Sequence, residues 1–249
     1  MKRIVWFGAF SAVIGALLNS GCAKFPANGF NTFTTRLIFT MRLSGAVQWG
    51  QNQGKTYVYL FPIRVSTDVN PSGGPEPVVS GVSGSGNGMV TGVCTDFILY
   101  DPTSPNPYQI WHFQDTNLTA ATLVGYAISR SDPRNTTTDP PSVLQCEMDM
   151  SQIVPVADVS TIKSVQINFL TMDRRALNGT SHSWDALGDS RLATENKRYL
   201  RFDLNNNRII NNTQTSIEPP TIDVNDGSGL GNDSDLDMVD WSIEIQRQQ

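Results

Sequence analysis

The amino-acid sequence predicts an all-β fold, an antiparallel β-sandwich with long loops rich in glycine, proline and serine. Three observations lead to this prediction. Apolar and polar residues alternate in about ten short segments, turn-forming residues separate the segments, and no long segment has the 3.6-residue period of a helix. A β-barrel is the alternative arrangement of such strands. A parallel α/β fold is disfavoured, because the sequence offers no segments for the crossover helices that it needs.

The chain begins with a segment that is typical of export signals. Two basic residues precede a mostly apolar run over residues 4–18, and Ser20 and Gly21 precede Cys22. The run of about 15 residues is shorter than the ~20 that a helix needs to cross the hydrocarbon core of a bilayer. A basic start, a short apolar run and small residues at its end together indicate a cleaved signal peptide.

With small residues directly before its cysteine, this segment resembles the signal peptides of bacterial lipoproteins. Asn19 departs from their pattern, in which an aliphatic residue lies three places before the cysteine. The resemblance implies cleavage before Cys22, acylation of the Cys22 sulfur and anchoring of the mature chain in the cell envelope by lipid. Because Ala23 is not an aspartate, it also implies the outer membrane or the cell surface. A transmembrane anchor and an ordinary signal peptide with an incidental cysteine are the alternatives.

The resemblance divides the chain into three parts. Residues 1–21 are expected to be the signal peptide and residues 22–31 a lipidated tether, in which proline, asparagine and glycine disfavour regular structure. Residues 32–249 are expected to form a single β-sandwich domain, because their number suits one sizeable hydrophobic core.

The charge of the mature chain disfavours nucleic acid as a partner. The whole chain has 18 basic and 23 acidic residues, and loss of Lys2 and Arg3 with the signal leaves a net charge of about −7. Nucleic-acid binding needs clustered lysine and arginine that neutralise phosphates, and only isolated pairs such as Arg174 and Arg175 occur. The expected partners are the membrane, through the lipid anchor, and a glycan or another envelope protein.

Strands are predicted where apolar residues recur at every second position. Residues 37–43 place Leu37, Phe39 and Met41 on one face and mostly polar residues on the other, which is the pattern of a half-buried strand. The other strands predicted from alternation or from an apolar run are residues 89–100, 108–114, 123–130, 143–150, 162–172, 197–204, 208–216 and 241–246.

Four further segments carry specific local predictions. Residues 57–65 are apolar on both faces and predict a central strand, with a bulge or an edge at Pro62. Residues 67–88 are rich in glycine, proline and serine and predict a long surface loop. Residues 183–188 predict one helical turn with a serine cap and a glycine stop. Residues 205–207 are three asparagines and predict a tight hairpin, because asparagine tolerates the left-handed conformation.

Two cysteines remain once Cys22 is assigned to lipid. A Cys94–Cys146 disulfide is predicted, because only one pairing is possible and an exported protein meets an oxidising compartment. Closing a loop of about 50 residues stabilises a fold by roughly 4 kcal/mol in the chain-entropy model. Two buried free thiols are the alternative, since both residues lie in apolar, strand-like segments.

The sequence contains no recognised catalytic motif. Its two histidines are His112, in an apolar strand-like segment, and His182, on a polar loop, and neither belongs to a nucleophile or zinc motif. No catalytic residue is therefore predicted. If the protein is a hydrolase, the candidate active-site residues are Asp173, His182, Asp185 and Asp189. The alternative interpretation of this segment is a solvated connecting loop.

Residues 223–240 form an acidic segment that suggests a calcium site. Alternating aspartates supply oxygen ligands at positions 1, 3 and 5 of a calcium-type loop, whereas the glycine of an EF-hand is replaced by Met238. The expected cofactor is thus none, or a structural calcium ion in a looser site. The alternative is a solvated acidic loop beside the last strand. The candidate ligands are Asp223, Asp226, Asp233, Asp235 and Asp237.

These observations predict a lipid-anchored cell-envelope protein that acts as a non-catalytic binding or structural module. Trp49, Trp111 and Trp184 offer aromatic faces for a glycan, although a tryptophan in a strand more often belongs to the core. An envelope hydrolase acting on polysaccharide or peptide is the alternative function.

Overall fold

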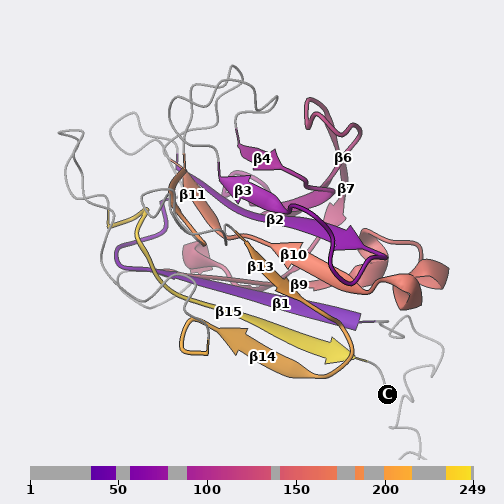
Figure 1. The fold of residues 1–249 in the computed structure, drawn as a ribbon. Helices are drawn as coiled ribbons and strands as arrows, with labels where there is room; N and C mark the ends of the chain where they lie inside the picture. The colour runs from indigo at the N-terminus through magenta and orange to yellow at the C-terminus, as the bar shows by residue number, and fades with distance from the viewer. Residues whose placement is uncertain are drawn as a thin grey trace, which may run out of the picture. The chain divides into compact units, whose positions relative to one another are not determined.

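The structure is a computed structural model, and it describes residues 35–48, 57–77, 89–135, 141–172, 183–187, 199–214 and 234–247. All strands in these ranges belong to one compact unit, Phe33–Gln249 (Figure 1). The predicted signal peptide and tether, residues 1–31, lie outside the described residues. Within the described ranges, no helix has the length and apolar character needed to cross a membrane.

One layer of the fold is a five-stranded antiparallel sheet with the strand order β14-β15-β1-β9-β8. The central strand, β1, pairs with β15 on one side and with β9 on the other. The first and last strands of the described chain therefore lie side by side in the middle of this layer. Its strands are β1 (Thr35–Leu43), β8 (Ile128–Ser131), β9 (Val143–Asp149), β14 (Arg208–Asn211) and β15 (Met238–Arg247).

The other layer is an eight-stranded antiparallel sheet with the order β12-β11-β2-β5-β6-β7, in which β10 also pairs with β2, and β13 with β10. Its strands are β2 (Val58–Ser66), β5 (Asp96–Tyr100), β6 (Tyr108–Phe113), β7 (Ala121–Tyr126), β10 (Ser164–Ile167), β11 (Leu170–Met172), β12 (Ser183–Ala186) and β13 (Leu200–Phe202). The remaining elements are a separate hairpin, β3 (Pro75–Pro77) and β4 (Val90–Gly92), and three short 3₁₀ helices, η1 (Pro133–Asn135), η2 (Met150–Gln152) and η3 (Val156–Thr161).

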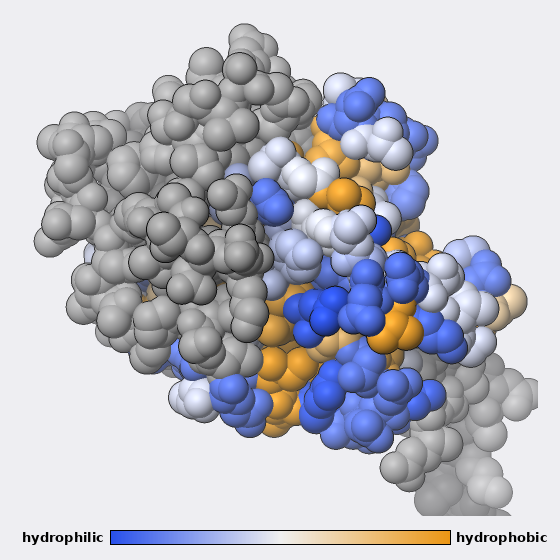
Figure 2. Space-filling model, in the orientation of Figure 1, coloured by the Kyte–Doolittle hydropathy of each residue, from blue (hydrophilic) through white to orange (hydrophobic). Residues whose placement is uncertain are grey.

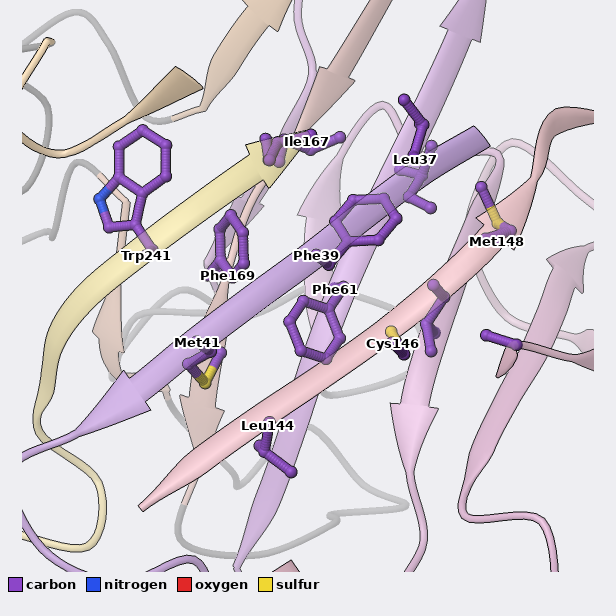
Figure 3. Packing of buried hydrophobic residues seen from close by; sticks show 14 of the residues in the cluster. Leu37, Phe39, Met41, Phe61, Leu144, Cys146, Met148, Ile167, Phe169 and Trp241 are labelled. Atoms are coloured by element: carbon purple, nitrogen blue, oxygen red, sulfur yellow. The ribbon is translucent and has the colours of Figure 1, made fainter. Parts of the chain in front are cut away.

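The main hydrophobic core lies between the two sheets. The alternating side chains Leu37, Phe39 and Met41 of β1 are fully buried in it, as are Phe61 and Phe169 from the opposite layer. The ring centroid of Phe39 lies 5.8 Å from that of Phe61 and 6.4 Å from that of Phe169. Hydrophobic surface is visible between hydrophilic residues in Figure 2, and Figure 3 shows side chains from β1, β2 and β9 meeting in the core. Two open sheets that bury their inner faces against each other confirm the predicted β-sandwich, and neither closes on itself over the described strands.

Strand β2 is buried on both faces, as its sequence predicts. Tyr59, Phe61 and Ile63 belong to the main core between the sheets. Val58 and Leu60 belong to a second hydrophobic cluster, which lies on the opposite face of the eight-stranded sheet. The apolar character of both faces of β2 therefore follows from its position between two clusters.

The irregularity predicted at Pro62 is present, and it is formed by the neighbouring strand. β11 pairs with β2 up to Leu60, and β10 pairs with it from Ile63 onward. Between these two ladders, the backbone N–H of Asn168 donates to the carbonyl oxygen of Pro62 at 3.1 Å. Proline has no backbone N–H, so a strand that continued a regular ladder past Pro62 would lack one hydrogen-bond donor. The break between β11 and β10 falls at this point and avoids that loss.

Three of the predicted strands are each divided in two, and one of them, residues 162–172, forms β10 and β11, which both pair with β2. Residues 89–100 form β4 and β5, because Gly92 adopts a φ of +75° and approaches the backbone of Gly74 too closely for any side chain. Residues 123–130 form β7 and β8, which belong to different sheets, and the chain passes between the layers at Ala127. A strand that changes layers keeps its period-two pattern, so the pattern alone does not reveal the crossing.

The two short turns predicted from local residues are wrong. Residues 183–188 do not form a helical turn; Ser183–Ala186 is the strand β12, which pairs with β11. Residues 205–207 do not close a hairpin, because β13 pairs with β10 in one sheet and β14 with β15 in the other. Phe202 and Ile210 pack against the main core from opposite layers, and this burial outweighs the local turn preference of asparagine.

The predicted Cys94–Cys146 disulfide is also wrong, since both cysteines are free and buried. Cys94 lies in the second cluster, where its thiol donates to the carbonyl oxygen of Asp96 at 3.1 Å. Cys146 lies in the main core, opposite Phe39 of β1. The eight-stranded sheet separates the two residues. Burial raises the pKa of both thiols, which disfavours the thiolate that oxidation requires.

Candidate functional site

Asp185, the described member of the carboxylate group considered for a hydrolase, has a structural role. Its side chain is buried, and its Oδ2 accepts a hydrogen bond of 2.6 Å from the backbone N–H of Met238 on β15. Its Oδ1 accepts one of 2.8 Å from the N–H of Ala186. The carboxylate therefore ties β12 of one sheet to the start of β15 in the other. Asp173, His182 and Asp189 lie outside the described residues.

Two of the five candidate calcium ligands are described, and one of them holds the chain near the end of β1. Asp235 Oδ1 accepts from the backbone N–H of Ala46 at 2.8 Å, and its Oδ2 accepts from Gln48 Nε2 at 2.7 Å. Asp237 is fully buried, and its carbonyl oxygen accepts from the N–H of Ser44. Asp223, Asp226 and Asp233 lie outside the described residues. Among all the residues that the structure describes, no three His, Cys, Asp or Glu side chains are grouped so as to hold a metal ion.

Calcium binding by the acidic segment stays a prediction that a melting experiment tests. If calcium binds the folded chain, the melting temperature should rise when millimolar calcium replaces excess chelator, because a ligand of the native state shifts the folding equilibrium. Differential scanning fluorimetry of the purified chain in the two buffers measures the shift, with magnesium as the control. Equal melting temperatures in calcium and in chelator would reject the site.

The clearest candidate for a binding surface is the edge formed by β7 and β8, which we call the β7–β8 edge. Leu123, Val124, Tyr126 and Ile128 are 37–59% exposed. They make up half of the eight large hydrophobic residues exposed in the described part of the chain. Clustered exposed apolar residues on a soluble domain are typical of an interaction site.

The topology explains why this edge is exposed. β7 ends the eight-stranded sheet and β8 ends the five-stranded sheet, and each has one pairing partner among the described strands, β6 and β9 respectively. The ladder between β6 and β7 contains a bulge, where Leu123 faces Trp111 and Gly125 faces Ile110. Val124 is therefore the extra residue of the bulge. Both strands run along the same side of the sandwich, since a single residue, Ala127, connects them.

A buried tyrosine joins the two layers directly behind this edge. The hydroxyl of Tyr108, on β6, donates to the carbonyl oxygen of Ser131 at 2.5 Å and accepts from the N–H of Gln145 at 3.0 Å. The backbone oxygen of Tyr108 also accepts from the N–H of Ala127 at 2.9 Å. One residue of the eight-stranded sheet is thus bonded to both β8 and β9 of the five-stranded sheet.

β7 contains no charged residue, and Arg130 is the charged residue of β8. No charged residue occurs between Asp115 and Arg130. Asp115 accepts from the hydroxyl of Thr119 at 2.7 Å, and Arg130 Nε donates to the buried carboxylate of Glu147 at 2.6 Å. Arg130 shares Glu147 with Arg36, and its side chain is 45% exposed. A partner of β7 therefore meets apolar side chains and backbone, whereas a partner of β8 also meets this arginine.

One strand inward from the edge, the structure brings together a histidine and an aspartate that the sequence analysis did not connect. His112 and Asp96 face each other across β6 and β5, and His112 Nδ1 lies 2.8 Å from Asp96 Oδ1. The side chain of His112 is 44% exposed, whereas that of Asp96 is 1% exposed. Burial raises the pKa of the Asp96 carboxyl, and the hydrogen bond with His112 opposes this shift. The register of two antiparallel strands creates the pair, and a single sequence does not specify that register.

We expect the free energy of unfolding to show the raised pKa of Asp96. A carboxyl whose pKa is higher in the folded state contributes stability at low pH that is lost as pH rises through the folded pKa. The isosteric Asp96→Asn substitution removes this titration, so the variant should gain stability relative to the wild type as pH rises from about 3.5 to 7. Urea unfolding at several pH values measures the difference.

Asp115 provides the matched control for this measurement. Its side-chain hydrogen bond with Thr119 lowers the pKa of its carboxyl. The stability contributed by Asp115 is therefore present at neutral pH and lost as pH falls through its folded pKa. Asp115→Asn should then lose stability relative to the wild type as pH rises, the opposite trend to Asp96→Asn. The same trend for both variants would contradict the assignment for Asp96.

Comparisons with protein-family models, curated proteins and solved structures find no match to this chain.

Proposed function

We propose that this chain is a lipid-anchored protein of the bacterial cell envelope that binds another protein and performs no catalysis. The lipid anchor rests on the signal-like segment that ends at Cys22. The binding role rests on one observation, the cluster of exposed apolar side chains on the β7–β8 edge. An apolar edge of this kind exposes backbone groups and hydrophobic surface together, and both favour pairing with a protein segment.

A protein suits this edge better than a glycan does. Glycan sites use an exposed aromatic face for stacking, together with polar groups. Tyr126 is exposed on the edge, but its exposed neighbours Leu123, Val124 and Ile128 are apolar. The ring of Trp111 is stacked on Phe97, with centroids 6.1 Å apart and an interplanar angle of 4°, and packs against the second cluster. Its indole N–H donates to Gln109 at 3.1 Å. Trp111 is therefore occupied by its own protein, while Trp49 lies outside the described residues.

A site-specific photo-crosslinker tests the binding role in the envelope itself. With a photoreactive residue at Val124, we expect discrete protein adducts after irradiation of membranes that carry the processed chain. The matched control is Val156 on η3, which is 65% exposed and distant from the edge in sequence. Adducts at both positions alike, or at neither, would contradict a binding site at the β7–β8 edge.

The anchor has its own test. Mass spectrometry of the mature N-terminus should show that the chain begins at Cys22 and that this residue carries acyl chains. Because more than one chain gives stable membrane attachment, the processed protein should also sediment with membranes and enter the detergent phase. An unmodified Cys22, or cleavage at another residue, would reject the lipid anchor and the proposed location at the outer membrane or cell surface.

A hydrolase is the second candidate function, and the His112–Asp96 pair is the observation that favours it. A half-exposed histidine held by a buried carboxyl is suited to proton transfer. Turnover of envelope polysaccharide or peptide that is lost in His112→Gln but kept in Asp115→Asn would support this function. Absence of turnover by the wild type across both substrate classes would reject it.

A further inference from the structure

We propose that the partner at the β7–β8 edge is a second copy of this chain, which pairs with β7 as an antiparallel strand. This inference deepens the proposed function and rests on it, because it assigns the occupant of the same surface. Two features of β7 argue for a second copy, its backbone groups and the absence of charge along it, and the bulge at Val124 limits the length of the pairing.

The first argument is the orientation of the backbone groups of β7. The backbone N–H groups of Gln114 and Ala127 form the hydrogen bonds with Ala120 and Tyr108 that continue the β6–β7 ladder at its two ends. In an antiparallel ladder, residues alternate between bonding to the neighbouring strand and pointing away from it. About half of the N–H and C=O groups of β7 therefore point away from β6, toward the side where no described strand pairs. The carbonyl oxygen of Tyr126 accepts from Gln152 Nε2 at 3.0 Å, so the groups offered to a partner lie toward the Ala121 end of β7.

The second argument is charge complementarity. Monomeric proteins protect an exposed sheet edge with lysine, proline, inward charge or a β-bulge, and of these devices β7 has the bulge at Val124. The segment from Thr116 to Ser129 contains neither a proline nor a charged residue. A partner strand must therefore also be neutral and apolar, or it would lose the hydration of its charges without compensation. A two-fold axis between two copies of β7 meets this requirement by symmetry, because each apolar side chain faces the same kind of surface.

The bulge at Val124 sets the length of the pairing. The bulge at Val124 interrupts the regular ladder of β7, so only a few residues on either side of it can pair with a second strand. Such a short pairing is weak between freely diffusing molecules. It is strengthened when both copies are anchored in one membrane, because confinement raises their effective concentration. The inferred dimer is therefore a pairing of anchored chains, and β8 supplies Ile128 at its margin.

Cysteine crosslinking in membranes tests this pairing. In the processed full chain carrying Val124→Cys, a short bis-maleimide should produce a covalent dimer of twice the monomer mass. Val156 lies on η3 and is more exposed than Val124, 65% against 45%. Val156→Cys should nevertheless yield about tenfold less dimer, because only random collisions bring two copies of η3 together. The native Cys94 and Cys146 are buried, and the wild-type chain controls for their reaction.

A second variant shows whether the dimer depends on strand pairing. Leu123→Lys in the Val124→Cys background should lower the yield of dimer about fivefold or more, because like charges brought together across a two-fold axis oppose pairing. The same lysine placed at Val156 should leave the yield unchanged. A yield that does not respond to Leu123→Lys would overturn the pairing, as would equal yields at positions 124 and 156.

The outcomes separate this inference from the proposed function. If photo-crosslinking at Val124 produces adducts with a different protein and bis-maleimide produces no dimer, the binding role stands and the second copy is rejected. If neither reagent captures any protein at Val124, both the binding role and the second copy fail.

Discussion

Replacing Phe39 with alanine is expected to lower the free energy of unfolding by about 3–5 kcal/mol, the range for truncation of a large buried aromatic side chain. Phe39 is fully buried in the central strand of the five-stranded sheet. Its ring packs against Phe61 and Phe169 from the opposite layer. The substitution therefore removes the contact that joins the two sheets at the middle of the core. Urea unfolding followed by tryptophan fluorescence measures the loss.

The control for this experiment is an exposed apolar residue in a strand of the same sheet. Ile209 on β14 is 52% exposed, so Ile209→Ala should change the free energy of unfolding by no more than about 0.5 kcal/mol. A loss below about 1 kcal/mol for Phe39→Ala would contradict the packing of the two sheets around this ring.

Replacing Asp185 with alanine is expected to lower the free energy of unfolding by about 3 kcal/mol. The substitution leaves the buried N–H groups of Met238 and Ala186 without their acceptor, and each such loss costs about 1–3 kcal/mol. Asp185→Asn retains one oxygen acceptor, so its loss should be about half as large. Chemical denaturation of both variants measures the two values.

A surface aspartate distinguishes this structural role from a general effect of losing negative charge. Asp240 is about half exposed, and its Oδ2 lies 3.6 Å from Arg42 Nε. An exposed ion pair of this kind contributes at most about 1 kcal/mol to the free energy of unfolding. Asp240→Ala should therefore be much less destabilising than Asp185→Ala. Equal losses for the two alanine variants would refute the role of Asp185 as an acceptor between β12 and β15.

The sequence predicts the core of this fold because the alternation of apolar and polar residues along a strand indicates which side chains are buried. Leu37, Phe39 and Met41 alternate with polar residues, and they all enter the main core. The apolar run of residues 57–65 likewise predicts a strand covered on both sides. These predictions hold because a single strand is enough to state which of its own faces is apolar.

Two of the wrong predictions concern relations between distant segments, whereas the helical turn expected at residues 183–188 is a local prediction that the pairing of β12 with β11 overrides. Three asparagines at 205–207 resemble a hairpin turn, yet Phe202 and Ile210 pack in different layers. Cys94 and Cys146 form the only possible pair in composition, yet a sheet separates them. The local sequence shows that a segment can form a turn, or that two thiols are present. The strand order of the two sheets decides whether the flanking strands pair and whether the two thiols meet.

The same limit applies to the candidate sites. Residues 123–130 are apolar and β-branched enough to predict a strand, but their exposure depends on β7 and β8 being the last strands of their sheets. His112 meets Asp96 only through the register of β5 with β6. Asp185 shows the converse case, since a carboxylate in a polar segment proves to be a buried acceptor.

The bonds of Tyr108 behind the β7–β8 edge bear on how fast and how tightly a partner can bind. Its hydroxyl and its backbone oxygen hold the crossing at Ala127 and the ends of β8 and β9 in one arrangement. A strand that docks here meets a template already in its bound geometry, so little conformational entropy is lost on association. Recognition is then expected to proceed as rigid docking, and changes at the contact surface should act on the lifetime of the complex more than on its rate of formation.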